Sequence, residues 1–463
     1  MSLSDTTPLN AAIAARQSSR QLAILPTSAR NDALTAMHYA LSVAKDEILA
    51  ANAEDMQLAE AAVLAGSISP SLMKRLDLGK KGKYADMLNG ILSVRDLEDP
   101  VGKIDRRTLL DEGLTLERIS CPIGVLLIIF EARPEVIANI ASLAIKSGNA
   151  AILKGGKEST KSFIAISRVL SAALETTLVP SASLQLLTTR DAIIPLLGLD
   201  THIDLVVPRG SNDLVRHIKS HTQIPVLGHA DGLCSAYLRP DYPAALATRI
   251  ILDAKTSYPA ACNSLETLLV DEACLLRDTG NFLPVASALL ERGVELRCDA
   301  HVREFLTAAL PSATGVKAAD ENRDFDTEFL DLTLAVKTIP SGASAGAALA
   351  TAMEHINKHG SHHTDVILTL DEGIANGFLA GVDSAGVFWN TSSRLADGQR
   401  YGFGTEVGIS TNKIHARGPV GLEGLTIYKW VVKGNGQVSE DYGEGEGKKP
   451  WLHRTLPVGE GSS

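Results

Sequence analysis

The sequence has few aromatic residues, few cysteines and no long apolar run, and each shortage excludes a class of protein. Phe, Trp and Tyr make up 4% of the 463 residues, so Ala, Leu, Ile and Val must form most of the core, as they do where helices cover parallel strands. The longest purely apolar run, residues 125–130, is far shorter than the roughly 20 residues that cross a bilayer. With 45% hydrophobic and 21% charged residues, the chain is predicted to form about two or three globular α/β domains.

The chain also lacks an excess of positive charge: its formal net charge is −10, and no long Lys/Arg run occurs. Binding to a nucleic-acid backbone needs a cationic surface, so no nucleic-acid partner is expected. No signal peptide with a charged, an apolar and a small-residue region opens the chain, and no membrane partner is expected. The first residues include Arg16 and Arg20 but also Asp5, so a mitochondrial presequence is an alternative to the cytoplasmic location that we expect.

The cysteines are odd in number and share no Cys-x-x-Cys spacing, which favours a reducing compartment over a disulfide framework and argues against structural zinc. They are Cys121, Cys234, Cys262, Cys274 and Cys298. Four histidines also cluster late in the chain, at His355, His359, His362 and His363. Because this cluster lacks the Glu of an H-E-x-x-H site, we expect no metal there, and a polar helix end followed by a loop is the simpler interpretation.

The flanking segments have distinct patterns. Residues 31–63 repeat apolar positions at helical spacing, which predicts an amphipathic N-terminal helical region. Residues 99–121 alternate apolar and polar positions, which predicts a hairpin-like arm. Residues 434–463 contain Gly-Glu-Gly-Glu-Gly and several Ser, which is typical of a flexible tail.

The middle of the chain alternates short apolar runs with helical patterns, and the run beginning at Gly124 is followed by Pro134 in a first-turn position. Predicted helices near residues 134–148, 161–174 and 211–220, with a further short one, separate the strands. The five predicted strands cover residues 124–130, 150–154, 184–187, 203–207 and 225–228. This order predicts a doubly wound parallel sheet, which binds its ligand at the carboxyl ends of its strands.

Two of these strands end in small residues and cations. Lys154-Gly-Gly-Lys157, with Gly155 and Gly156 between the lysines, follows one strand, and Pro208-Arg-Gly210-Ser211 follows another. Neither matches a G-x-G-x-x-G or Walker A pattern. The Gly210-Ser211 turn, at a helix N-terminus, would suit a pyrophosphate, and Lys154 and Lys157 would suit ribose hydroxyls or a 2′-phosphate. Tight turns with solvated lysines are the alternative for each motif taken alone.

A polar loop with a cysteine, Lys255 to Cys262-Asn263, directly precedes an apolar strand. A thiol in such a loop is accessible, and neighbouring backbone N–H groups can lower its pKa and hold an oxyanion. A small buried hydrophobe is the alternative for Cys262, and it is the interpretation that we adopt for the other four cysteines.

The ordered motifs resemble the γ-glutamyl phosphate reductases, also called glutamate-5-semialdehyde dehydrogenases, of the aldehyde dehydrogenase superfamily. The resemblance extends from about Leu76 to Gly436, and the form is fungal-like and free-standing, with no fused kinase domain. The motifs that carry it are Phe130-Glu-Ala-Arg-Pro134, Lys146-Ser-Gly-Asn149, Ile152-Leu-Lys-Gly-Gly-Lys157, Val207-Pro-Arg-Gly-Ser211, Pro225-Val-Leu-Gly-His-Ala-Asp-Gly232, Cys262-Asn263 and Lys413-Ile-His-Ala-Arg-Gly-Pro419.

The resemblance implies an aldehyde dehydrogenase-like α/β fold with a doubly wound cofactor domain, an α/β catalytic domain and a small β oligomerisation arm, and therefore a homo-oligomer. The implied parts are an NADP-binding domain at 1–100 and 122–230, a catalytic domain at 231–412, an oligomerisation arm at 101–121 and 413–433, and the tail at 434–463. The superfamily's nucleophile falls on Cys262, its cofactor-ribose lysine on Lys154, its pyrophosphate turn on Gly210 and Ser211, and its nicotinamide-ribose glutamate on Glu328. An exposed carboxylate is the alternative for Glu328.

Two departures from ordinary aldehyde dehydrogenases bear on the reaction. Where hydrolytic members have Glu-Leu-Gly-Gly, with the Glu that activates water, this chain has Gly228-His-Ala-Asp231. The superfamily's oxyanion Asn is replaced by Ala132, so backbone N–H groups near Cys262, with Asn263, are expected to hold the oxyanion. Loss of the water-activating base suits a thioester that is formed from an acyl phosphate and must not be hydrolysed.

The implied reaction is NADPH-dependent reduction of γ-glutamyl phosphate to glutamate 5-semialdehyde through a Cys262 thioester, with a glutamate 5-kinase as the functional partner. Arg133, Arg394 and Arg417 lie in matched motifs and are candidate ligands of the substrate's carboxylate and phosphate, with surface ion pairing as the alternative. A hydrolytic aldehyde dehydrogenase would have the missing Glu. A catalytically inactive scaffold would be expected to lose Cys262 or the Lys154 motif, and both are intact.

Overall fold

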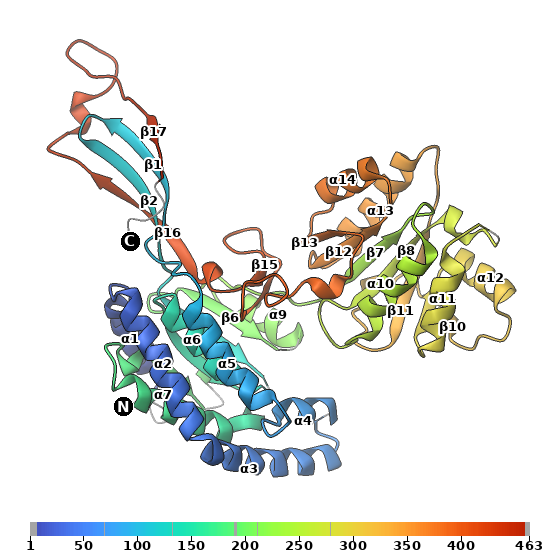
Figure 1. The fold of residues 1–463 in the computed structure, drawn as a ribbon, viewed down its shortest axis with the longest axis horizontal. Helices are drawn as coiled ribbons and strands as arrows, with labels where there is room; N and C mark the ends of the chain where they lie inside the picture. Colours follow the sequence, from blue (N-terminus) through green and yellow to red (C-terminus); the bar gives the residue numbers. More distant parts are fainter. Residues whose placement is uncertain are drawn as a thin grey trace. The chain divides into compact units, whose positions relative to one another are not determined.

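The computed structural model describes residues 7–458 apart from 69, 132, 189–191, 211 and 278, and the side chains of 70–72 are not described. The chain divides into two compact units (Figure 1). Unit 1 contains residues 1–227, 403–408 and 420–463, and unit 2 contains residues 228–402 and 409–419. Ser211 and Ala132, which the sequence singled out, lie outside the described residues.

Unit 1 is built around a parallel sheet with the strand order β5-β4-β3-β6. Its strands are β3 Val125–Phe130, β4 Ala150–Gly155, β5 Leu184–Leu187 and β6 Leu205–Arg209. Its helices are α1 Pro8–Leu22, α2 Thr27–Val43, α3 Lys45–Leu64, α4 Pro70–Leu76, α5 Lys83–Asp96, α6 Val136–Lys146, α7 Thr160–Leu174, α8 Ile193–Leu197 and α9 Asn212–Ser220. On β3, Val125, Leu127 and Ile129 pack in one core cluster with Ala11 of α1 and Leu196 of α8.

The structure confirms one sequence expectation for unit 1 and corrects another. The helical region predicted for residues 31–63 is present as α2 and α3, between which the backbone leaves the helical conformation at Ala44. The fifth strand, predicted at residues 225–228, is reduced to a single parallel bridge between Val206 and Val226. Pro225 has no N–H to donate to the sheet, and the chain enters unit 2 at Gly228, so the pairing extends no further.

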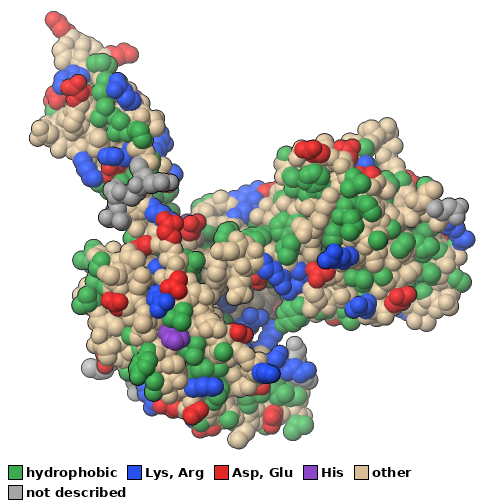
Figure 2. Space-filling view, viewed as in Figure 1, with side chains coloured by type: hydrophobic (Ala, Val, Ile, Leu, Met, Phe, Trp, Pro, Cys, Tyr) green, Lys and Arg blue, Asp and Glu red, His purple; other side chains and the backbone are tan. Residues whose placement is uncertain are grey.

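A separate antiparallel sheet, with the order β16-β2-β1-β17, also belongs to unit 1. Its strands are β1 Ile104–Asp111, β2 Leu114–Pro122, β16 Thr426–Lys433 and β17 Arg454–Leu456. The hairpin predicted for residues 99–121 is present as β1 and β2, and β16 pairs with β2 along its whole length. Hydrophobic side chains lie among charged ones on this sheet (Figure 2), and those of Tyr428, Trp430 and Val432 on β16 are exposed. Its role as an oligomerisation arm stays a prediction.

The expectation of a flexible tail from residue 434 is wrong for part of that segment. Strand β17 pairs with β1, the Tyr442 and Trp451 rings stack with centroids 4.0 Å apart, and the Tyr442 hydroxyl donates to Asp111 at 2.8 Å. The glycine-rich composition suggested flexibility. Tyr442 lies before the glycine run and Trp451 and β17 lie after it, so contacts on both sides hold the segment to the sheet.

Unit 2 is a second parallel α/β layer, with the strand order β10-β9-β11-β8-β7-β12-β13. Its strands are β7 Cys234–Leu238, β8 Leu265–Asp271, β9 Glu295–Cys298, β10 Val316–Ala318, β11 Thr333–Ile339, β12 Thr364–Leu368 and β13 Gly386–Trp389. Its helices are α10 Ala244–Thr256, α11 Phe282–Glu291, α12 Ala300–Ala309, α13 Ala345–His359 and α14 Glu372–Gly381. Two short strands, β14 Gly408–Ser410 and β15 Gly418–Val420, pair with each other where the chain passes between the units.

Side chains of the central strands of unit 2 alternate between two cores. On β8, Leu268 and Val270 pack with residues of α10, α11 and α12, whereas Leu269 packs with residues of α13 and α14. This alternation is the period of two that a strand imposes, and it explains why all seven β8 positions are buried. The result is a sheet covered on both faces, from which the loops at the ends of β7 and β8 project. None of the described helices is long and apolar enough to cross a membrane.

Candidate active site

Cys262 lies in a short loop of unit 2 between α10 and β8, and short-range hydrogen bonds shape this loop. The Ala261 N–H donates to the Tyr258 carbonyl at 3.1 Å, and the Ser264 N–H donates to the Ala261 carbonyl at 2.8 Å. The Ser264 hydroxyl also donates to the Ala254 carbonyl at the end of α10. The loop therefore has a defined conformation, in which the Cys262 side chain is only half-buried.

Asn263, the neighbour of the candidate nucleophile, anchors the loop to a second segment. Its side-chain amide donates to the Ala396 carbonyl at 2.9 Å, and its backbone carbonyl accepts from the Ser393 hydroxyl at 2.7 Å. The side chain is 5% exposed. In this arrangement Asn263 fixes the position of Cys262, and the contribution to an oxyanion site predicted for its side chain stays a prediction.

The loop that precedes β7 lies directly against Cys262. A Cβ on Gly232 would lie 2.1 Å from the Cys262 carbonyl oxygen, so only glycine permits this approach. The Gly232 N–H donates to a carboxylate oxygen of Glu328 at 3.0 Å. Unit 2 thus brings Glu328, predicted from the sequence as a cofactor ligand, to the loop that supports the thiol.

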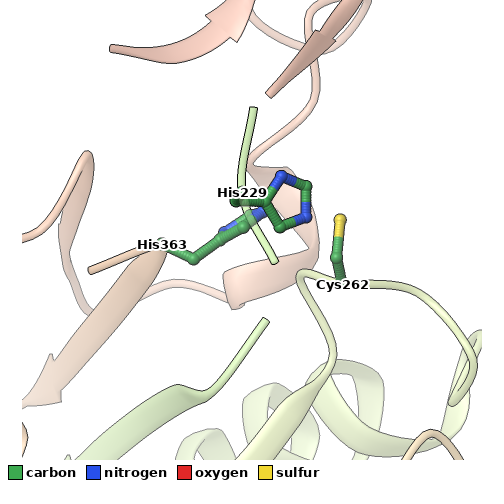
Figure 3. Close-up of side chains that lie close together, drawn as sticks. All are labelled: His229, Cys262 and His363. Carbon is green, nitrogen blue, oxygen red and sulfur yellow. The ribbon is translucent and has the colours of Figure 1, made fainter. Parts of the chain in front are cut away.

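Two histidines also lie beside the thiol (Figure 3). Ligand atoms of His229, Cys262 and His363 are all within 4.8 Å of one another. His229 belongs to the segment that replaces Glu-Leu-Gly-Gly, and Figure 3 shows one of its ring nitrogens directed toward the Cys262 sulfur. In the sequence this segment stood out only for its missing Glu, although the histidine next to the Glu position was a signal that the segment still carries a titratable group.

The ring of His229 has a defined orientation, because its Nδ1 lies 3.0 Å from the Ile409 carbonyl oxygen. A carbonyl oxygen only accepts hydrogen bonds, so Nδ1 carries the proton. In the neutral ring, Nε2 then has a lone pair. A neutral imidazole with this tautomer beside a thiol can accept the thiol proton.

The other cysteines are poor competitors as nucleophiles. Burial raises the pKa of the thiols of Cys121, Cys234 and Cys298, that of Cys298 to about 12. Burial raises the pKa of Cys274 as well. The thiolate is the reactive form, so these four thiols are less reactive than an ordinary cysteine. Cys234 contacts the Cys262 loop, because its Sγ lies 3.4 Å from the Cys262 carbonyl oxygen.

A fully buried ion pair, Lys255 with Glu266, underlies the Cys262 loop. The Lys255 Nζ lies 2.8 Å from a Glu266 carboxylate oxygen, and both side chains have no exposed surface. Burial raises the pKa of Glu266 to about 7, with the Lys255 charge opposing that change, and burial lowers the pKa of Lys255. Glu266 also accepts the Leu330 N–H at 3.3 Å. The pair therefore connects the end of α10 to the segment that carries Glu328.

The three arginines predicted to bind substrate have different surroundings. Arg394 lies in unit 2, where its Nε donates to the Ser257 hydroxyl at 3.2 Å and its guanidinium lies over the Tyr258 ring. Burial and the charge of Arg400 lower the pKa of Arg394. The residues Ser393 and Ala396 on either side of it hydrogen-bond to Asn263, so Arg394 belongs to the segment that lies against the Cys262 loop.

Arg417 instead binds Asp383 at 3.1 Å, which is the ion-pairing alternative. Arg133 belongs to unit 1 and is exposed. Of the three, only Arg394 is therefore brought near Cys262 within unit 2.

The predicted cofactor residues lie at the carboxyl ends of β4 and β6 in unit 1. Lys154 is 6% exposed, and its Nζ donates to the Gly155 carbonyl at 2.6 Å. Burial lowers the pKa of Lys154. A Cβ on Gly155 would lie 2.0 Å from the Phe163 ring of α7, so this glycine permits the close approach of helix and strand. Gly156 is half-buried, and Lys157 after it is exposed.

Gly210, predicted to bind the pyrophosphate, lies next to an acidic side chain that the sequence did not predict there. A Cβ on Gly210 would lie 2.5 Å from a carboxylate oxygen of Glu131. Gly210 therefore stands beside an acidic side chain as well as near the start of α9. Lys154 lies at the carboxyl end of β4 and Gly210 follows the carboxyl end of β6, and these two strands flank β3 in one sheet.

Curated relatives cover nearly the whole chain, although no protein-family model matches it. A probable γ-glutamyl phosphate reductase of Schizosaccharomyces pombe is 52% identical over 438 residues, which is 94% of each chain. The solved structure of a γ-glutamyl phosphate reductase from Thermotoga maritima is 34% identical, covers 94% of this chain and 100% of its own, and has a TM-score of 0.86. An acetylating aldehyde dehydrogenase from Geobacillus thermoglucosidasius is 18% identical with a TM-score of 0.64 over 93% of this chain and 97% of its own, which shows a shared fold.

Proposed function

Since the chain belongs to the γ-glutamyl phosphate reductases, oxidoreductases with the aldehyde dehydrogenase fold, we propose that it reduces L-glutamyl 5-phosphate to L-glutamate 5-semialdehyde through a thioester on Cys262. The observation that carries the proposal is the half-buried Cys262 thiol with a His229 ring nitrogen directed toward it. The semialdehyde cyclises to pyrroline-5-carboxylate, so the reaction is the second step of proline formation from glutamate.

Cys262 acts first, as a thiolate. His229 accepts the thiol proton at Nε2 while its Nδ1–H stays bound to the Ile409 carbonyl. The sulfur forms a bond to the γ-carbonyl carbon, the bond from that carbon to the phosphate oxygen breaks, and phosphate leaves. Backbone N–H groups of the loop, which Asn263 holds in place, stabilise the oxyanion.

The second half of the reaction regenerates the thiolate. When bound, NADPH would supply a hydride to the thioester carbonyl carbon, which is far more electrophilic than the carbon of a carboxylate. The carbon–sulfur bond of the resulting thiohemiacetal then breaks, the aldehyde is released, and Cys262 is again a thiolate beside His229. The segment 228–231 has no Glu, and His229 is already protonated once it has accepted the thiol proton, so water is not activated against the thioester and the acyl group is kept for reduction.

The residues at the end of β4 are suited to a phosphorylated nicotinamide dinucleotide. The buried Lys154 amine and the exposed Lys157 provide two cations, one on either side of a two-glycine turn, for ribose hydroxyls and a 2′-phosphate. Gly210 and the start of α9 suit the pyrophosphate, but Glu131 must turn away from it, since two negative groups at one turn repel each other. Glu328, whose carboxylate accepts the Gly232 N–H at 3.0 Å, is the residue that we propose for the nicotinamide ribose.

Arg394 is the substrate residue that we favour, because its segment contacts the Cys262 loop at Asn263 and its charge complements a carboxylate or phosphate. Free acyl phosphates hydrolyse readily, so a glutamate 5-kinase must supply this substrate as the functional partner.

The exposed aromatic residues of β16 support assembly into a homo-oligomer. We also propose that the enzyme works in the cytoplasm.

The reverse reaction tests the proposed function. Purified enzyme with pyrroline-5-carboxylate and NADP⁺ is expected to form NADPH, followed by its absorbance, only when phosphate or arsenate is present. The reason is that only an oxyanion added from solution can release the acyl group from Cys262. Turnover at the same rate in phosphate-free buffer would show that water releases it, and would support a hydrolytic aldehyde dehydrogenase instead.

A further inference from the structure

We propose that His229, Cys262 and His363 form a binding site for a thiophilic divalent cation such as Zn²⁺, which inactivates the enzyme reversibly by taking the Cys262 sulfur as a ligand. The three side chains come from separate parts of unit 2: the segment before β7, the loop before β8 and the residue before β12. Figure 3 shows their side chains gathered in one place.

The separations are close to what such a cation needs. Bonds of roughly 2.0–2.3 Å at tetrahedral angles separate neighbouring ligand atoms by about 3.5 Å. The ligand atoms of the three residues lie within 4.8 Å of one another. Each atom therefore has to move by about an ångström at most, which small side-chain rotations supply.

Each histidine already has the outer contact that a metal-binding imidazole requires. The Nδ1 of His229 is bound to the Ile409 carbonyl, and the Nδ1 of His363 lies 2.9 Å from the Thr364 hydroxyl oxygen. Hydrogen bonds at Nδ1 fix the ring and favour Nε2 as the ligand atom. The two rings pack edge to face with centroids 5.0 Å apart.

A second observation points independently to a ligand. His363 is 1% exposed, and within the part of the chain that the structure describes its Nε2 has no hydrogen-bond partner. A buried ring nitrogen without a partner destabilises the folded protein. A bound cation would satisfy this nitrogen.

The chemistry of the three ligands selects the kind of cation. Two imidazoles and a thiolate suit Zn²⁺ and similar soft or borderline ions, whereas Mg²⁺ and Ca²⁺ need oxygen ligands. Binding replaces the thiol proton with the metal, releasing one H⁺ for each cation bound. With three protein ligands, the fourth position is left to water.

The consequence for activity rests on the proposed function, but the binding does not. A metal-bound Cys262 sulfur has its nucleophilic electron pair in the metal bond, so it cannot attack the acyl phosphate. A chelator that removes the cation restores the free thiol and the activity.

Co²⁺ is the probe for the site, because a thiolate bound to Co²⁺ gives an intense near-ultraviolet charge-transfer band. Titration of tag-free full-length protein is expected to give this band at one equivalent, with competition by Zn²⁺ and none by Mg²⁺. Cys262→Ser should abolish the band, and His363→Gln should weaken Co²⁺ affinity by more than about tenfold. The control variants His359→Gln, whose ring pairs with Asp326 elsewhere in unit 2, and Cys121→Ser should leave the titration unchanged.

The outcomes separate this proposal from the proposed function. A missing band, or a band that survives Cys262→Ser but is lost in Cys234→Ser, would overturn the metal site while leaving the thioester mechanism untouched. A band that depends on Cys262 and His363, together with full reductase activity in the Zn²⁺-loaded enzyme, would support the metal site and disprove Cys262 as the nucleophile.

Discussion

Gly232 packs directly against the backbone of Cys262, such that a Cβ on Gly232 would lie 2.1 Å from the Cys262 carbonyl oxygen and 2.6 Å from its Cα. Both atoms belong to the backbone, so no side-chain rotation can relieve the overlap. The position of the thiol therefore depends on the absence of a side chain thirty residues earlier in the sequence.

Gly232→Ala is expected to reduce reductase activity by about a hundredfold, because displacement of Cys262 by an ångström misaligns the attacking sulfur. The measurement is kcat for the reverse reaction, with circular dichroism to establish that the variant is folded. Gly346→Ala, where an added Cβ meets nothing closer than 3.8 Å, is the matched control and should retain activity. Normal activity in Gly232→Ala would show that the close approach does not matter for catalysis.

Cys262→Ser is expected to remain folded and to lose nearly all turnover. A serine hydroxyl is a much poorer nucleophile near neutral pH, and an oxygen ester accepts hydride less readily than a thioester. NADPH binding should persist, since the proposed nucleotide residues other than Glu328 belong to unit 1.

Labelling with iodoacetamide and peptide mapping give the second measurement for Cys262. Substrate-protected inactivation should follow modification of Cys262, since burial raises the pKa of each of the other four thiols. Inactivation that follows another cysteine, or substantial activity in Cys262→Ser, would contradict the thioester mechanism.

Lys157→Glu is expected to weaken NADPH binding by roughly tenfold and NADH binding much less, because only NADPH carries a 2′-phosphate to pair with the lysine. The measurement is the Kd of each cofactor by fluorescence titration. Lys161→Glu is the control, since this lysine lies one helical turn further on and pairs with Glu54. Equal losses for the two cofactors, or no loss for either, would remove Lys157 from the site.

Lys255→Met is expected to destabilise the protein by about 3–5 kcal/mol, because it leaves the Glu266 carboxyl buried without its counter-charge. Differential scanning calorimetry measures the lower Tm. The double variant Lys255→Met/Glu266→Leu should recover most of the loss, since it removes both buried charges. A double variant as unstable as the single one would show that packing, and not charge, is the cause.

The stability of the single variant Lys255→Met should also depend on pH in a definite direction. In the wild type, burial already raises the pKa of Glu266 from 4.5 to about 7, and loss of Lys255 removes the charge that opposes this change. The folded state then binds a proton that the unfolded state has released, so the stability of Lys255→Met falls as pH rises from about 4.5 through 7. Unfolding at pH 5, 6.5 and 8 checks this, and a variant that gains stability with rising pH would contradict the assignment.

The sequence by itself determined the α/β class, the parallel strands at 125–130 and 150–155, and the loop that carries Cys262. These features depend on local patterns: apolar runs of strand length, turn residues at their ends, and a polar loop before a buried strand. The motifs around Lys154 and Cys262 also predicted the family, which a relative of 52% identity confirms.

Only the tertiary structure decided which distant residues meet at the thiol. His229, Cys262 and His363 are separated by 33 and 101 residues, and no local pattern relates them; the parallel order of β8, β7 and β12 brings them together. The strand β17 was missed for the same reason, since three residues in a glycine-rich segment have no strand signal until β1 offers them backbone partners. The strand propensity of a segment depends on its own residues and their neighbours in the chain. Strand pairing in a sheet depends on partner segments that are distant in the sequence.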